Sequence, residues 1–196
     1  MQYATHHENS SANIPYSSTL KPSSRDENHP AVTTMRGHWY VACRSRQLRQ
    51  RPFERVMLGE QLVLFRMRDG QVGALANRCA HRNLALSRGK VSADGLSCAY
   101  HGWTYDPSGT CVHVPAACNG CSPQARPRVR SYPVCEKQGL VWVYLSAKGE
   151  EPEGEPLDFP FHGQSRWQHW FMERVFEGDA FNCAENFLDC PHTTHV

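Results

Sequence analysis

Two short stretches, CAHR at residues 79–82 and CAYHGW at residues 98–103, decide the fold of this chain. Each stretch combines one cysteine with one histidine, as C-x-H in the first and C-x-x-H in the second. Sixteen residues lie between the two pairs. A thiolate and an imidazole from each of two loops can place two sulfurs on one metal and two nitrogens on another. The expected metal ligands are Cys79, His81, Cys98 and His101.

This division of ligands is the Rieske arrangement of a [2Fe–2S] cluster, in which two histidines replace two cysteines on one iron. Gly102 and Gly109 permit tight loops, and Tyr100 and Trp103 can shield the cluster. The alternative is a zinc site with two cysteine and two histidine ligands. Zinc sites usually pair like with like, as C-x2–4-C and H-x3–5-H, so the mixed pairs favour the iron–sulfur cluster.

The sequence around these motifs predicts a mainly β domain. Short β-rich runs alternate with turn signals from His38 onward, and Asp69-Gly70 is a strong hairpin signal. Regular short strands of this kind are typical of a small sandwich or barrel. The expected strands lie at 39–42, 61–66, 72–76, 103–105, 111–114 and 139–145.

The chain divides into four segments by composition. Residues 1–35 are polar and rich in Ser, Asn and His, which predicts a disordered N-terminal arm. Residues 36–148 form the β domain, and residues 149–164, rich in Gly, Pro and Glu, form a linker. Residues 165–196 begin a second domain.

The second domain begins with two expected elements. Trp167 to Phe176 predicts one strand, and a helix is expected from an N-cap at Asp179 to about Cys190, before Pro191.

That helix carries a second chemical motif. Glu185, Asp189 and His192 stand at i, i+4 and i+7, so they lie on one face. A carboxylate beside an imidazole suits metal ligation or proton handling. Alone, such a triplet is more often a solvated polar face. A different, apolar face is expected to contain Phe181, Ala184, Phe187 and Leu188.

The two cluster motifs resemble those of the Rieske non-haem iron oxygenases, and the similarity extends over about residues 37–146. It implies a Rieske [2Fe–2S] β-sandwich domain followed by the start of an α+β catalytic domain. Respiratory-chain Rieske proteins carry an additional disulfide between the two loops. Its cysteines would fall at Leu84 and Tyr100 here, so the chain resembles the lower-potential oxygenase or ferredoxin type.

The segment from Glu185 is similar to the oxygenase motif E-N-x-x-D-x-x-H-x-x-x-x-H. The resemblance implies that Asp189 links the cluster of an adjacent subunit to a mononuclear Fe(II), and that His192 ligates this iron. The second histidine would follow Val196, and His195 has a different spacing. We therefore expect an N-terminal fragment that lacks a complete catalytic iron site.

The resemblance implies an oxidoreductase that takes electrons from a reductase or ferredoxin. Such a component passes them through the cluster to Fe(II), where O2 is used to hydroxylate, dihydroxylate or demethylate an organic, often aromatic, substrate. It also implies a homotrimer for the full-length protein. The alternative is a stand-alone electron carrier of the Rieske ferredoxin type, because only the cluster motif is complete.

Charge and hydropathy exclude other classes of partner. A net charge of +2 with a pI near 8.1 does not indicate nucleic-acid binding. The five arginines from Arg44 to Arg55 are interpreted as a solvated strand edge and turn. No stretch approaches the ~18 apolar residues that a transmembrane helix needs, so no membrane partner is expected.

The nine cysteines indicate a reducing cytoplasm, because their number is odd and their spacing is not that of a disulfide scaffold. Cys118 and Cys121 form a C-x-x-C pair, which we interpret as two free loop thiols rather than a redox or metal site. The cysteines expected to be small buried side chains are Cys43, Cys111, Cys135 and Cys183.

Overall fold

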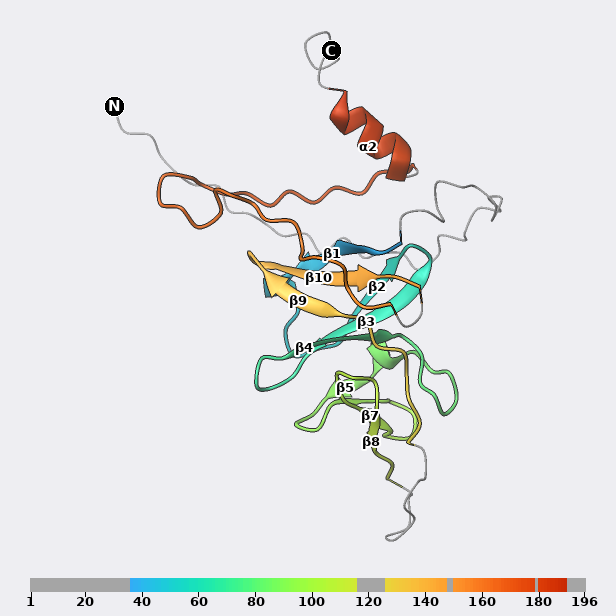
Figure 1. Cartoon of the computed structure of the whole chain (residues 1–196). Helices are drawn as coiled ribbons and strands as arrows, with labels where there is room; N and C mark the ends of the chain where they lie inside the picture. The colour runs from blue at the N-terminus through green and yellow to red at the C-terminus, as the bar shows by residue number, and fades with distance from the viewer. Residues whose placement is uncertain (1–35, 116–125, 148–149, 179, 190–196) are drawn as a thin grey trace.

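The computed structural model describes residues 36–115, 126–147, 150–178 and 180–189. Their ten strands form three antiparallel sheets, which lie one below another in Figure 1. The first sheet orders β1 (His38–Arg44), β10 (Leu140–Leu145) and β9 (Val134–Lys137). The second orders β2 (Phe53–Met57), β3 (Glu60–Arg66) and β4 (Val72–Ala76). The third orders β5 (Lys90–Val91), β6 (Leu96–Ser97), β7 (Thr104–Tyr105) and β8 (Cys111–His113).

The middle sheet is apolar on both faces, because a sheet covers it on each side. Leu62 and Leu64 of β3 pack with β1 and β10 in one core cluster. Val63 and Phe65, which alternate with them, pack in a second cluster with residues of the third sheet. A strand buried on both faces reads as a continuous apolar run instead of an alternating one. This explains the run Leu62–Phe65 and confirms the mainly β class.

The expected linker packs on the outer face of the first sheet. The Trp39 Nε1–H donates to the Gly154 carbonyl at 3.1 Å, and the Glu153 N–H donates to the Tyr144 hydroxyl at 3.2 Å. The Trp142 and Phe159 rings lie 6.3 Å apart between centroids. Residues 150–159 therefore form a strap over β10. With the strap on one side and the second sheet on the other, β10 is buried on both sides. The boundaries of the four segments stay predictions.

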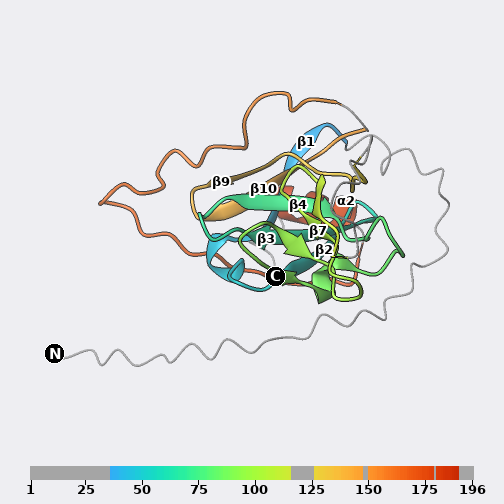
Figure 2. The ribbon, with the colours of Figure 1, turned by 90° about the horizontal axis from the view of Figure 1, so that it is seen from below.

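The prediction of a strand at 167–176 was wrong. Residues 167–176 have no regular secondary structure, and their backbone pairs with no sheet edge. Figure 2 shows the surrounding segment extending to one side of the sheets. Trp170 in this segment is 84% exposed and Phe171 is 41% exposed, so the apolar side chains that suggested a strand are not buried in a core of the described residues.

The other expected elements are present. Each of the six expected strands overlaps an observed one, and α2 spans Ala180–Leu188, whereas its expected N-cap, Asp179, lies outside the described residues. The elements that were not expected are β2, β5, β6, β9 and the short 3-10 helices η1 (Ser45–Gln47) and η2 (Leu86–Arg88).

The cysteines differ in burial. Cys43 and Cys111 are buried as expected, whereas Cys135 and Cys183 are only half-buried. Cys118 and Cys121 lie outside the described residues. Among the helices of the described segments, none has the length and apolar character needed to cross a bilayer.

Candidate metal centre

The two predicted cluster loops share one backbone design. In the first, the Cys79 N–H donates to the Leu84 carbonyl at 2.9 Å, and the Asn83 N–H donates to the Cys79 carbonyl at 2.9 Å. In the second, the Cys98 N–H donates to the Trp103 carbonyl at 2.8 Å, and the Gly102 N–H donates to the Cys98 carbonyl at 3.0 Å. Each cysteine therefore closes its own loop. In both loops its N–H donates to the carbonyl five residues later, and its carbonyl accepts the N–H four residues later.

The fifth residue of each loop has a left-handed backbone. Asn83 has a φ of 58° and Gly102 a φ of 68°. Glycine and asparagine are the residues that adopt this conformation most readily. The Asn83 side chain is also held, because its Oδ1 accepts a hydrogen bond from Arg78 Nε at 2.6 Å. The sequence thus specifies both turns locally.

The two thiols are buried together at the base of the loops. Cys79 is 2% exposed and Cys98 is 5% exposed, and both belong to the core cluster below the middle sheet. Burial, together with the adjacent Cys79 thiol, raises the pKa of Cys98. A metal has to displace the protons of such thiols, so loading of this site releases protons.

The two imidazoles lie together at the exposed tip. The His81 and His101 rings have centroids 4.7 Å apart. Trp103 stacks on His81 at 4.7 Å and 6°, and Tyr100 stacks on His101 at 3.8 Å. Desolvation lowers the pKa of His81, as do the nearby positive charges of His101 and Arg82. The site therefore favours the neutral imidazole, which is the form that ligates a metal.

The four side chains form one sulfur pair and one nitrogen pair. No three Cys, His, Asp or Glu side chains of the described residues converge on a position for a single ion. A mononuclear zinc site needs four converging ligands, whereas a Rieske cluster takes two ligands on each of two irons. The donor set fits the binuclear group better.

Tyr105 is a further residue of this site, and its sequence pattern predicts only a strand. Its hydroxyl lies 3.3 Å from Cys79 Sγ and accepts the Ala80 N–H at 3.1 Å. A metal-bound thiolate carries no proton, so there Tyr105 has to be the donor. The tyrosine is fully buried, and a buried tyrosine in an apolar strand gives no sequence signal that separates this role from core packing.

Two more contacts anchor the second loop. Ser97 Oγ and Thr104 Oγ1 lie 2.8 Å apart at its base, and the Thr104 hydroxyl also donates to the Gly102 carbonyl at 3.0 Å. These contacts fix the spacing between β6 and β7, from which the loop carrying Cys98 and His101 projects.

The second predicted motif lies elsewhere. α2 and the sheet that carries the second cluster loop lie at opposite ends of the molecule in Figure 1. Asp189 directly follows α2, and its N–H donates to the Glu185 carbonyl at 3.0 Å, so both carboxylates lie one helical turn apart, as expected. His192 and His195 lie outside the described residues. The chain therefore does not bring Asp189 to the four cluster side chains.

Comparison with known proteins gives a consistent result. Residues 38–133 match the family model of the Rieske [2Fe-2S] domain. The oxygenase subunit of 3-chlorobenzoate-3,4-dioxygenase from Comamonas testosteroni is 40% identical over 169 residues, which cover 81% of this chain and 39% of that protein. The oxygenase component of dicamba O-demethylase from Stenotrophomonas maltophilia is 42% identical over 128 residues, or 65% of this chain and 37% of that protein.

A solved structure is also similar. NdmA of Pseudomonas putida CBB5 superposes with a TM-score of 0.69 at 32% identity, over 80% of this chain and 48% of that one. The chain thus spans less than half of the length of these relatives.

Proposed function

Because this chain belongs to the Rieske non-haem iron oxygenases and corresponds to the N-terminal portion of their large subunits, we propose that Cys79 and Cys98 hold one iron of a [2Fe–2S] cluster and that His81 and His101 hold the other. The observation that carries this proposal is the separation of the donors into a buried sulfur pair and an exposed nitrogen pair. When bound, the cluster supplies reversible one-electron storage.

The chain's own residues set the path for the electron. The thiol side is buried in the core below β3 and β4, whereas the imidazole side is exposed. His81 and His101 each keep one ring nitrogen for a hydrogen bond to an outside acceptor. Trp103 and Tyr100 hold the rings in place by stacking. The imidazole edge is therefore the side through which electrons enter and leave.

In the complete oxygenase, electrons from a reductase or ferredoxin reach a mononuclear Fe(II) for O2-dependent hydroxylation, dihydroxylation or demethylation. His192 is a ligand of that iron, and Asp189 joins it to His101 of a neighbouring subunit in a homotrimer. The exposed position of Asp189, far from His101 within one chain, supports the pairing between subunits.

The substrate is a small organic molecule, and an aromatic one is favoured. Relatives are named for action on 3-chlorobenzoate and dicamba, and others are named as iron–sulfur subunits of a toluene-4-sulfonate monooxygenase system. The protein works in the cytoplasm, where the six cysteines of the described residues stay reduced or bind metal. The names of the relatives favour an oxygenase component over a stand-alone electron carrier.

The ligand assignment is tested by electron paramagnetic resonance of the reduced, iron-loaded protein. We expect a Rieske spectrum, whose average g value is lower than that of all-cysteine clusters because imidazoles ligate one iron. His101→Ala should abolish it. A matched control is His113→Ala, which removes an exposed imidazole of β8 and should leave the spectrum intact. An unchanged Rieske spectrum in His101→Ala would show that the assignment is wrong.

A further inference from the structure

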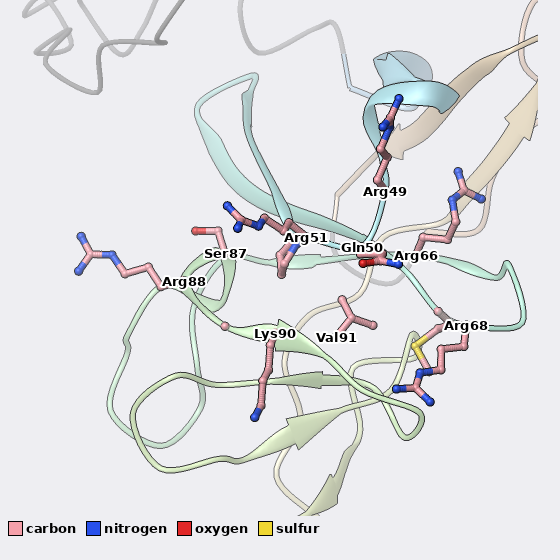
Figure 3. Close-up of a pocket in the computed structure, with 12 residues that line it drawn as sticks. Arg49, Gln50, Arg51, Arg66, Arg68, Ser87, Arg88, Lys90 and Val91 are labelled. Carbon is pink, nitrogen blue, oxygen red and sulfur yellow. The ribbon is translucent and has the colours of Figure 1, made fainter. Parts of the chain in front are cut away.

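A basic hollow of about 860 Å³ lies between the second and third sheets and is shown in Figure 3. It is formed by the chain before β2, the turn after β3 and the segment from η2 to β5. Its twelve lining residues include six cations and no acid. The six cations are Arg49, Arg51, Arg66, Arg68, Arg88 and Lys90.

Among the described residues, few acidic side chains neutralise this charge. Arg66 makes two hydrogen bonds of 2.6 Å with the Glu136 carboxylate. The other five cations form no ion pair with the described residues. The wall also touches Glu54, which accepts a hydrogen bond from Ser87 Oγ at 3.0 Å. A surplus of positive charge therefore remains around the hollow.

The cations surround the hollow without converging on one point. Figure 3 shows Arg51 and Arg88 directed to the left and Arg49 directed upward, whereas Lys90 points downward and Arg68, on the right, also points downward. A small anion such as phosphate is bound by donors that point at one position. Cations spread over a rim instead match a broad surface of opposite charge.

The hollow is joined directly to both cluster loops. Lys90 pairs with Ser97 in the β5–β6 ladder, and Ser97 is followed by Cys98. η2 follows the first cluster loop, and Leu86 of η2 packs in the same core cluster as Cys79 and Cys98. A protein docked on this rim would therefore lie beside the module that holds the cluster.

We infer that the basic hollow docks the acidic face of the protein that delivers electrons to the cluster; this inference rests on the proposed function. Charge complementarity is the reason for this occupant, since encounter between redox proteins is steered by opposite charge. A nucleic acid fits less well, because the pI of 8.1 is below that of a typical nucleic-acid-binding domain.

The test compares two triple variants of the iron-loaded chain. R51Q/R68Q/K90Q removes three exposed cations of the hollow, and R126Q/R166Q/R174Q removes three exposed cations that do not line it. The probe is a reduced [2Fe–2S] ferredoxin of net negative charge, and stopped-flow absorbance follows reduction of the cluster. We expect the first variant to lower the bimolecular rate constant about tenfold at low salt, and the second to lower it less than twofold. The difference should shrink at 0.5 M salt, as screening predicts.

Two controls separate this inference from the proposed function. Reduction by the uncharged 5-deazariboflavin radical should be equal in all three proteins, since that reductant needs no docking. Fluorescence anisotropy of the labelled ferredoxin measures docking whether or not the chain assembles a cluster. Failure to assemble the cluster would contradict only the proposed function. Equal slowing in both triple variants, or association that ignores the hollow's charges, would overturn the docking site. So would tighter binding of a labelled DNA duplex than of the ferredoxin, because the hollow would then be a general polyanion site.

Discussion

The cluster loops and the tail at residues 160–189 carry the two chemical motifs of this chain, and they are held in opposite ways. Each loop closes on its own cysteine through two backbone hydrogen bonds, and both thiols are buried. The tail holds nine of the thirteen large hydrophobic side chains that are exposed in the described residues, with Leu188 81% exposed. One motif is therefore packed by its own domain, whereas the described residues leave the apolar surface beside the other motif exposed.

This difference shows where each site gets its geometry. The cluster site draws its four proposed ligands from two local turns over a common core. The tail is tied to the β domain by exposed contacts, such as Glu173 with Arg55 at 3.3 Å and with Arg44 at 3.9 Å. Exposed ion pairs contribute little free energy. An exposed apolar surface of this kind marks an interaction site. Packing among the described residues therefore does not fix the geometry around Asp189.

The largest expected effect compares two glycines with nearly equal backbone angles. Gly109 beside β8 has a φ of 80°, and Gly163 in the tail has a φ of 79°. An added Cβ at Gly109 would lie 2.0 Å from the Val129 carbonyl oxygen, whereas at Gly163 it meets nothing within 4 Å. We expect Gly109→Ala to lower the free energy of unfolding by about 3 kcal/mol, from left-handed strain plus the backbone clash.

Gly163→Ala is the matched control, and its cost should be about 1 kcal/mol, from the left-handed backbone alone. Urea unfolding followed by far-UV circular dichroism measures both values. Equal costs for the two variants would mean that the cluster-bearing sheet is no more tightly packed than the tail.

The second prediction concerns the carboxylate of the tail. In the complete oxygenase, Asp189→Asn should leave both metals bound but lower turnover by about 10–100-fold, the usual cost of losing a hydrogen-bonded partner of a metal ligand. Glu177→Gln is the control, because it removes a tail carboxylate outside the motif. Iron content and steady-state oxygen uptake are the measurements. Loss of the cluster signal in Asp189→Asn would contradict the role of a link between subunits.

The placement of the four proposed ligands was largely predictable from the sequence because its information is local. Cysteine, histidine, asparagine and glycine at fixed spacing specify the proposed ligands and both turns. The role of Tyr105 was not predictable, because it depends on β7 bringing residue 105 against residue 79. The hollow was missed for a similar reason. In the sequence, Arg49 and Arg51 belong to one basic run with Arg44 and Arg55. The fold places Arg49 and Arg51 beside cations of the segments from β3 to β5. Arg44 and Arg55 instead pair with Glu173.

The tail shows the opposite limit. Its apolar pattern from Trp167 to Phe176 predicted a strand, yet a strand needs an edge to pair with, and no neighbouring residues of the described chain offer one. The helix was predictable because its hydrogen bonds are made within the segment. Local hydrogen bonding, not apolar pattern, separates the correct prediction from the wrong one.

The third prediction compares two buried tyrosines. Tyr105→Phe removes the donor to Cys79 Sγ. The reduced cluster carries more negative charge and accepts this bond more strongly, so its loss should lower the reduction potential. A difference of about 1 kcal/mol corresponds to about 40 mV for one electron. The starting value should lie in the lower half of the Rieske range of ~−150 to +300 mV.

The control is Tyr132→Phe. Tyr132 is buried in the core cluster between the first and second sheets, away from the cluster loops, and its hydroxyl donates to the Glu60 carboxylate at 2.5 Å. Its potential should match that of the unmodified protein in a spectroscopic redox titration. A Tyr105→Phe potential that also stays unchanged would show that the hydroxyl does not act on the cluster.

The smallest expected effect compares an ion pair within the β domain with one that reaches the strap. The two-point hydrogen bond from Arg66 lowers the pKa of Glu136, against an opposing contribution from burial. A carboxylate with a lowered folded pKa stabilises the protein above its ordinary pKa of about 4.3, and this contribution is lost as the pH falls through the folded value. Because both side chains are partly exposed, Glu136→Gln should cost only about 0.5–1 kcal/mol at pH 7.

That cost should be constant from pH 7 to about pH 5 and should shrink below about pH 4, as the unmodified carboxylate takes up a proton. Glu155→Gln is the control, since the Glu155 carboxylate lies 3.5 Å from Lys137 Nζ and is 86% exposed. Its unfolding free energy should equal that of the unmodified protein at every pH, as measured by urea unfolding at pH 7, 5 and 3.5. A pH-independent cost for Glu136→Gln would instead mean that the carboxylate acts through packing and that its charge contributes nothing. The β domain would then resemble the tail, because neither would gain stability from its ion pairs.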